Sequence, residues 1–169
     1  YDWHAKVCHS LPLVYGDCLK PNAISISAHQ PGGACTGATA DGRKGGEILA
    51  DASLSPDHGT DTHGPLAVFQ SAMQVKHDAY QGTLMNMKFH PSAVSNEQGL
   101  NKLIALLETY FFDMKGMEMQ MNIISSETMR KAQAHPEDYQ DLVVRVAGFS
   151  AYFVEVYKEA QDAQIARTE

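Results

Sequence analysis

The chain has 169 residues, 44% hydrophobic and 20% charged, with a formal net charge of −7 at pH 7. This length and composition are typical of one globular domain with its own core. The acidic balance argues against nucleic-acid and polybasic membrane contacts, which need clustered Lys and Arg, and no apolar run approaches the roughly 20 residues of a membrane span.

The three cysteines are Cys8, Cys18 and Cys35, and none of them forms a Cys-x-x-Cys pair. An odd number at such spacing argues against a disulfide framework and against a zinc knuckle. No signal-peptide pattern opens the chain. We therefore expect a reduced, cytoplasmic environment.

The first half of the chain has few regular patterns. Residues 1–22 carry no readable periodicity, whereas residues 24–29 alternate apolar and polar side chains as a half-buried strand does. Residues 30–64 are rich in Gly, Ala, Thr, Asp and Pro, which predicts a long irregular segment of the kind that often serves function. A short helix is predicted over 65–76. Its apolar face would comprise Leu66, Phe69 and Met73.

The second half alternates between strand and helix periodicities. Strands are predicted over 83–89, 117–123, 142–147 and 151–156, and helices over 96–115, 126–135 and 157–169. Ser95 with Gln98 matches a capping box, and Ser126 is placed to cap the following helix. Strands separated by helices imply parallel pairing through right-handed crossovers, so the predicted class is α/β.

Gly148 lies between the last two apolar segments, where a glycine is usually a turn or bulge residue. It stands, however, in the run Arg145-Val146-Ala147-Gly148-Phe149-Ser150-Ala151-Tyr152-Phe153. This run resembles the fingerprint of glycyl radical enzymes over nine consecutive positions. Further stretches resemble C-terminal blocks of the same family, in the same order, at residues 37–44, 64–68, 82–89, 133–139 and 165–169.

The resemblance implies the domain organisation and the fold. Residues 23–169 would form the glycyl radical domain, and residues 1–22 an unassigned lead-in segment. The fold would be the C-terminal part of a ten-stranded α/β barrel, with the radical glycine on a buried loop. A partner, or the rest of a longer chain, would complete the barrel.

The resemblance also implies the chemistry. Gly148 would carry a carbon-centred radical that the flanking amide nitrogen and carbonyl delocalise when the centre is planar, and a β-carbon would crowd that plane. No cofactor would be bound permanently, because an S-adenosylmethionine/[4Fe–4S] activating enzyme installs the radical. The residues expected to support the radical loop are Arg145, Val146, Ala147, Phe149, Ser150 and Tyr152.

In the family the radical passes to a cysteine thiol, and the thiyl radical then takes a hydrogen atom from a small organic substrate. That cysteine stands in a Gly-Cys-Val/Ile-Glu-like context, which none of the three cysteines here matches. We therefore expect a larger polypeptide that carries the thiyl cysteine, or the N-terminal part of the same enzyme. Neither nucleic acid nor a membrane is expected as a partner.

Several polar side chains are candidates for lining the substrate cavity, with a solvated or hydrogen-bonded face as the alternative for each. The first candidates are Ser25, Ser27, His29 and Asn86. The same two interpretations, cavity lining or a solvated or hydrogen-bonded face, apply to Lys88, Glu118, Gln120 and Asn122. Asp57, His58, Asp61 and His63 form a cluster of acids and imidazoles, but their spacing matches no metal motif, so no metal site is expected.

The fingerprint looks more like the branch of dehydratases, decarboxylases and C–C, C–N or C–S lyases than like pyruvate formate-lyase. Residues 85–91 and 109–111 lean toward arylacetate decarboxylases, and fumarate-adding synthases stay open. Two departures blur the subfamily: Phe149 stands where Tyr is commoner, and Gly45-Gly46 replaces Ala-Gly. The alternative is a non-catalytic spare part that restores an oxygen-damaged enzyme.

Overall fold

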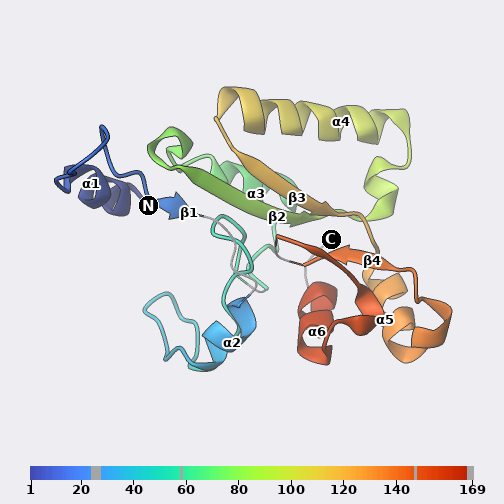
Figure 1. Ribbon diagram of the computed structural model, residues 1–169. Helices are drawn as coiled ribbons and strands as arrows, with labels where there is room; N and C mark the ends of the chain where they lie inside the picture. The colour runs from blue at the N-terminus through green and yellow to red at the C-terminus, as the bar shows by residue number, and fades with distance from the viewer. Residues whose placement is uncertain (24–27, 58, 147, 167–169) are drawn as a thin grey trace.

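The computed structural model describes residues 1–23, 28–57, 59–146 and 148–166. The helices and strands follow one another along the chain as shown in Figure 1: α1 Asp2–Ser10, β1 Asn22–Ala23, α2 His29–Ala34, α3 Pro65–Ala72, β2 Gly82–Lys88, α4 Glu97–Glu108, β3 Glu118–Asn122, α5 Ser126–Ala134, β4 Val143–Arg145, β5 Ser150–Tyr152 and α6 Lys158–Ala166. This alternation confirms the α/β class.

The central sheet is parallel, with the strand order β1-β2-β3. Its register places Met85 opposite Met119 and Asn86 opposite Gln120. The parallel pairing of β2 with β3 across α4 agrees with the prediction. Strands β4 and β5 instead form an antiparallel hairpin, because the few residues between them are too short for a crossover.

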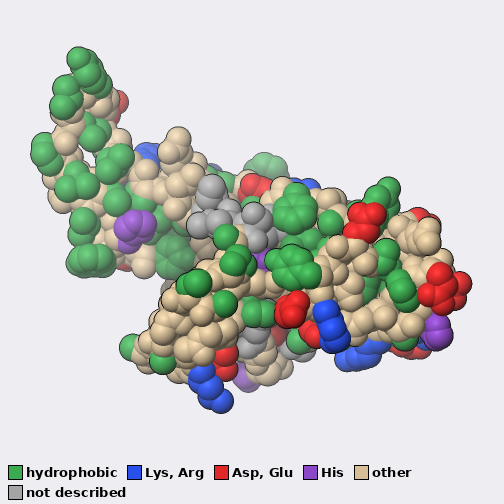
Figure 2. Space-filling view, turned by 60° about the horizontal axis from the view of Figure 1, so that its bottom comes forward, with side chains coloured by type: hydrophobic (Ala, Val, Ile, Leu, Met, Phe, Trp, Pro, Cys, Tyr) green, Lys and Arg blue, Asp and Glu red, His purple; other side chains and the backbone are tan. Residues whose placement is uncertain are grey.

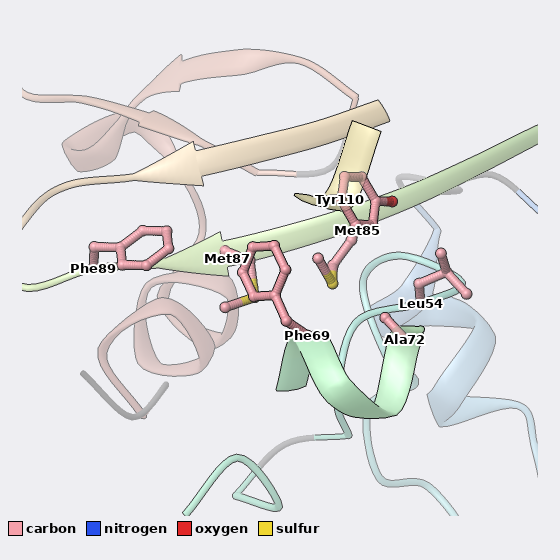
Figure 3. Packing of buried hydrophobic residues seen from close by; sticks show 7 residues of the cluster. All are labelled: Leu54, Phe69, Ala72, Met85, Met87, Phe89 and Tyr110. Carbon is pink, nitrogen blue, oxygen red and sulfur yellow. The ribbon is translucent and has the colours of Figure 1, made fainter. Parts of the chain in front are cut away.

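One face of the sheet packs against the main hydrophobic core. Met85 and Met87 point from β2 toward Phe69 and Ala72 of α3, and Tyr110 closes the cluster from the π-helical turn Thr109–Asp113 that follows α4 (Figure 3). The side chains of Met85 and Tyr110 are fully buried. Because side chains alternate along a strand, the residues between these methionines must face the other side.

The opposite face of the sheet is polar yet buried. Asn86, Lys88, Gln120 and Asn122 are each less than 10% exposed. Figure 1 shows the β4–β5 hairpin, α5 and α6 on this side of β2 and β3, with α4 on the other side. A second core, formed by Met129, Ala132, Val144, Val146 and Phe153, lies within this C-terminal layer. Buried polar groups need hydrogen-bond partners, so the polar face sets up specific contacts with that layer.

Three local predictions were wrong. Residue 29 begins α2 rather than ending a strand, since His29 is its first residue. The helix predicted to reach 76 ends at Ala72, and it buries Phe69 while leaving Leu66 60% exposed. Phe69 and Ala72 fill the core at the contact with β2, and this contact sets the rotation of the helix.

Both predicted helix caps are displaced by one residue. The Asn96 side chain caps α4 by accepting from the backbone N–H of Gly99, and Ser125 caps α5 by accepting from that of Thr128. Ser126 is the first residue of α5, and its hydroxyl accepts from the Lys88 ammonium and donates to a carbonyl of α6. The sequence pattern predicted that the Ser126 side chain caps the helix, but this side chain makes tertiary contacts instead.

The N-terminal segment, which the sequence left unassigned, contains α1 and projects away from the sheet. Its side chains Trp3, Val14 and Tyr15 are 77%, 87% and 90% exposed. Figure 2 shows hydrophobic side chains gathered over the arm at the upper left, on the side where Figure 1 places this segment. Among the described residues, no helix is long and apolar enough to cross a membrane.

Candidate functional site

The turn of the β4–β5 hairpin carries Gly148. The backbone N–H of Val146 donates to the carbonyl of Phe149 at 3.0 Å, which closes the hairpin around this turn. Gly148 has φ +80°, and an added Cβ would meet no atom within 4 Å. The resting loop therefore favours glycine through its left-handed backbone angle, which L residues rarely adopt, and not through a close contact.

The buried amides of the polar sheet face hold the backbone of this hairpin, and we call Asn86, Gln120 and Asn122 the amide clasp. Asn122 makes two of the contacts: its Nδ2 donates to the carbonyl of Arg145 at 2.7 Å, and its Oδ1 accepts from the N–H of Arg145 at 2.8 Å. The N–H and the carbonyl of Arg145 both point away from β5. The side chain of Asn122 satisfies both of these backbone groups.

The other two amides contact the turn itself. Asn86 Nδ2 donates to the carbonyl of Val146 at 3.2 Å and to a carboxylate oxygen of Asp51 at 3.0 Å. Gln120 Oε1 accepts from the backbone N–H of Gly148 at 3.1 Å. Asn86 and Gln120, which lie opposite each other on the two parallel strands, therefore hold two different residues of the same turn.

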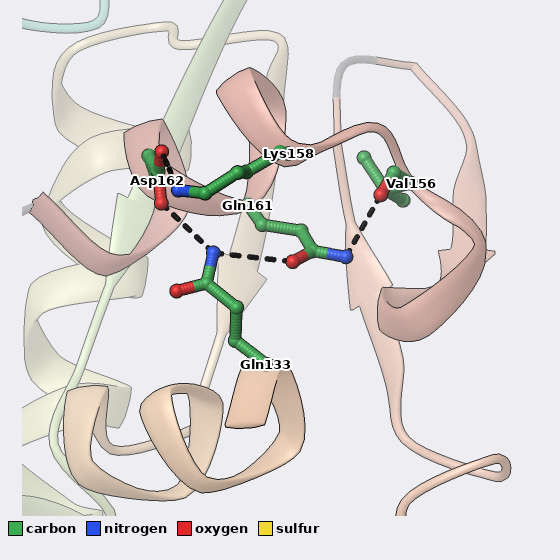
Figure 4. A network of polar contacts seen from close by, with 5 residues as sticks. All are labelled: Gln133, Val156, Lys158, Gln161 and Asp162. Carbon is green, nitrogen blue, oxygen red and sulfur yellow. Dashed lines mark hydrogen bonds and ion pairs between the residues drawn. The ribbon is translucent and has the colours of Figure 1, made fainter. Parts of the chain in front are cut away.

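The C-terminal layer fixes the hairpin from behind. Phe153, fully buried, follows β5 and packs with Val144 and Val146. Gln161 of α6 donates to the carbonyls of Phe153 and Val156 at 2.9 and 2.8 Å. Figure 4 shows the network that continues from Gln161 to Gln133, Asp162 and Lys158, and so ties α5 to α6. The hairpin is thus held between this layer and the clasp.

The residues predicted to support the loop differ in the contacts that they make. Val146 supports it by packing, since its side chain is 5% exposed. Arg145 contributes mainly through its backbone, because its guanidinium is only partly buried and donates to the Ser150 hydroxyl at 3.3 Å. Phe149 and Tyr152 are 45% and 47% exposed and contribute little packing within this chain.

Gly148 itself is exposed in this chain, as are Phe149 and Ser150. The buried loop expected from the sequence is therefore not closed by the described residues. The clasp covers the face of the turn toward the sheet, and the opposite face is open to whatever packs there. Ala147, also predicted to support the loop, lies outside the described residues.

The candidates for the substrate cavity separate in the structure. Ser25 and Ser27 lie outside the described residues, and His29 is buried at the start of α2. Asn86 is turned toward the β4–β5 turn, although it also borders a hollow beside α3, so its contact with substrate stays a prediction. Gln120 and Asn122 also hold the loop through its backbone groups. Their signal in the sequence was the alternation of amides with methionines over 117–123.

No group of three or more His, Cys, Asp or Glu side chains that could hold a metal ion occurs among the described residues, which include Asp57, Asp61 and His63 but not His58. The cysteines Cys8, Cys18 and Cys35 are all free thiols.

The parallel sheet and the clasped hairpin define an α/β protein in which buried amide side chains hold a glycine-bearing turn by its backbone groups. A family model described as "Glycine radical" matches residues 50–154. The chain belongs to the glycyl radical enzyme family.

The relatives that the chain matches are much longer. It is 48% identical over 147 residues to an indoleacetate decarboxylase of Tractidigestivibacter scatoligenes, covering 87% of this chain and 17% of that protein. It is 42% identical over 167 residues to a 4-hydroxyphenylacetate decarboxylase glycyl radical subunit of Clostridioides difficile, covering 99% and 18%. The glycerol-bound B12-independent glycerol dehydratase of Clostridium butyricum superposes with a TM-score of 0.84 at 42% identity, covering 97% and 21%.

Proposed function

We propose that this chain is the radical-storing C-terminal part of an anaerobic glycyl radical lyase, with the radical on the α-carbon of Gly148. The observation that carries the proposal is the clasped hairpin turn. Its one glycine with positive φ falls within the residues that the family model matches. The amide side chains hold the turn through its backbone groups, and Gly148 stays exposed.

The chemistry follows from the backbone. Removal of one α-hydrogen from Gly148 leaves an unpaired electron between an amide nitrogen and a carbonyl, and both groups delocalise it once the centre is flat. An S-adenosylmethionine/[4Fe–4S] activating enzyme would take that hydrogen, so the reactive chemistry comes from a cofactor while this chain positions the carbon that keeps the radical.

A cysteine outside these residues would receive the radical. Three observations support a larger polypeptide that carries it: the chain spans 17–21% of its relatives, Gly148 is exposed, and the N-terminal arm exposes large apolar side chains. Covering that arm would be favourable by about 25 cal/mol per Å² of apolar area. The same polypeptide would close the open face of the radical loop.

The reaction that we propose to assay first is decarboxylation of an arylacetate, because two of the relatives are arylacetate decarboxylases. Dehydration of a small polyol is the alternative, supported by the likeness to glycerol dehydratase. A spare part that repairs a damaged enzyme is a further alternative. Intact mass spectrometry decides against it if the chain is covalently continuous with a polypeptide that carries the thiyl cysteine.

The decisive experiment is anaerobic activation of the full-length enzyme, followed by electron paramagnetic resonance. We expect a glycyl doublet that Gly148→Ala abolishes. Gly46→Ala is the matched control, because Gly46 also has a positive φ with open space around it. A doublet that persists in Gly148→Ala would refute the assignment. Exposure of the activated enzyme to air should also cleave the backbone at Gly148 and release residues 149–169, as intact mass would show.

A further inference from the structure

The hydrogen bond between Gln120 and Gly148 joins the clasp directly to the proposed radical residue. Gln120 Oε1 lies 3.1 Å from the amide nitrogen of Gly148, and the Gln120 residue is only 7% exposed. The contact concerns the nitrogen next to the radical carbon, which is one of the two groups that would delocalise the spin. It can therefore act on the electronic state of the radical as well as on the shape of the loop.

A second hydrogen bond sets the orientation of the Gln120 amide. Its Nε2 donates to a carboxylate oxygen of Glu118 at 2.8 Å. An ionised carboxylate only accepts, so the NH₂ group must face Glu118 and the oxygen must face the N–H of Gly148. The two residues are two apart on β3 and therefore share a face.

The chain of groups is then polarised in one direction. The negative charge on Glu118 draws the Gln120 N–H, which increases the negative charge on the Gln120 oxygen and strengthens its bond to Gly148. A strong acceptor at that N–H makes the Gly148 nitrogen a better electron donor toward the α-carbon. The expected result is more spin on nitrogen, less spin on carbon and a more stable radical.

We propose that Gln120, oriented by Glu118, is a positioning residue that tunes the spin distribution and the stability of the Gly148 radical. This inference rests on the proposed function, since it needs a radical at Gly148. It goes further because it gives one side chain a role in the exchange of a hydrogen atom between Gly148 and a cysteine thiol. Gly148 gains the hydrogen atom, the thiol loses it, and Gln120 shifts the equilibrium between the two radicals. No other reactant enters that exchange.

The test uses the full-length enzyme grown with ¹⁵N-glycine and activated anaerobically. In Gln120→Met, which keeps the length of the side chain but removes the acceptor, the ¹⁵N hyperfine coupling should fall and the α-proton splitting should rise. The radical yield should fall by at most roughly fivefold, the value of one net hydrogen bond, because the resting glycine makes the same bond. Gln98→Met is the matched control, because Gln98 is exposed on α4, and it should leave both couplings unchanged.

A swapped pair separates tuning from folding. In the double variant Gln120→Glu with Glu118→Gln, a carboxylate replaces the amide as the acceptor and the new amide donates to it, so the ¹⁵N coupling should equal or exceed that of the wild type. If Gln120→Met yields no radical, restored yield and coupling in the swapped pair still support the proposal. Couplings in both variants that match the wild type, or a swapped pair without radical, would overturn it.

The two levels of inference fail in different ways. A wild-type enzyme without a glycyl doublet, or a doublet that survives Gly148→Ala, rejects the proposed function. A normal doublet with couplings that do not respond at Gln120 rejects only the tuning role.

Discussion

Replacing Asn122 by Leu should loosen the hairpin that β4 and β5 form. Asn122 is 6% exposed and satisfies both the N–H and the carbonyl of Arg145, at 2.8 and 2.7 Å. Leu has nearly the same size but cannot replace either bond. Each unsatisfied buried group costs about 1–3 kcal/mol, and water at the partly exposed hairpin offsets part of that. We therefore expect the free energy of local opening to fall by about 2–4 kcal/mol, which is about 30- to 1,000-fold in exchange protection.

Hydrogen–deuterium exchange of the full-length resting enzyme measures this directly, through peptides that cover residues 143–152. Asn101→Leu is the matched control, because Asn101 is an exposed residue of α4. In Asn101→Leu, the β4–β5 hairpin should keep the exchange protection of the wild type. Equal protection of the hairpin in the two variants would show that the clasp does not hold the loop, and the argument from buried amides would then be wrong.

Three further predictions concern the surrounding structure. Phe153→Ala should cost about 3–5 kcal/mol of stability by opening a cavity in the C-terminal core, whereas Phe112→Ala, at a side chain 71% exposed, should cost less than about 0.5 kcal/mol in chemical denaturation. Burial lowers the pKa of His77, so the folded state resists its protonation. Stability should then fall as the pH drops below about 6.5, by at most about 1.4 kcal/mol per pH unit, and thermal melts of His77→Gln should lack that part of the slope. Arg43 donates to three loop carbonyls, and Arg43→Lys should speed thermolysin cleavage within residues 30–64, because an ammonium cannot reproduce the guanidinium fork; an unchanged cleavage rate would contradict this.

Local patterns predicted the elements well where periodicity is strong. Strand β2 was predicted within a residue or two, and the helical repeat of α4 and the alternation in β3 were recognised. Caps and helix faces were less predictable. Ser126 and Asn96 show why, since neighbouring polar residues compete for one cap and tertiary contacts decide between them.

The alternation over 117–123 shows the limit of pattern reasoning. It predicts a strand with one face of methionines and one polar face, and the simplest expectation buries the methionines. In the structure Gln120 and Asn122 are buried while Met121 is 36% exposed. A hairpin more than twenty residues further along the chain packs on the polar face, and a local pattern has no information about such a partner.

The sequence by itself determined the α/β class, the parallel pairing of β2 with β3 and the glycine on which the proposed function rests, because these depend on residues close together in the chain. Only the tertiary structure decided which side chains hold that glycine. The clasp joins Asn86, Gln120 and Asn122 to residues 23 to 60 positions away. Their amides are buried beside the hairpin only once the parallel register of β2 and β3 has aligned them on one face of the sheet.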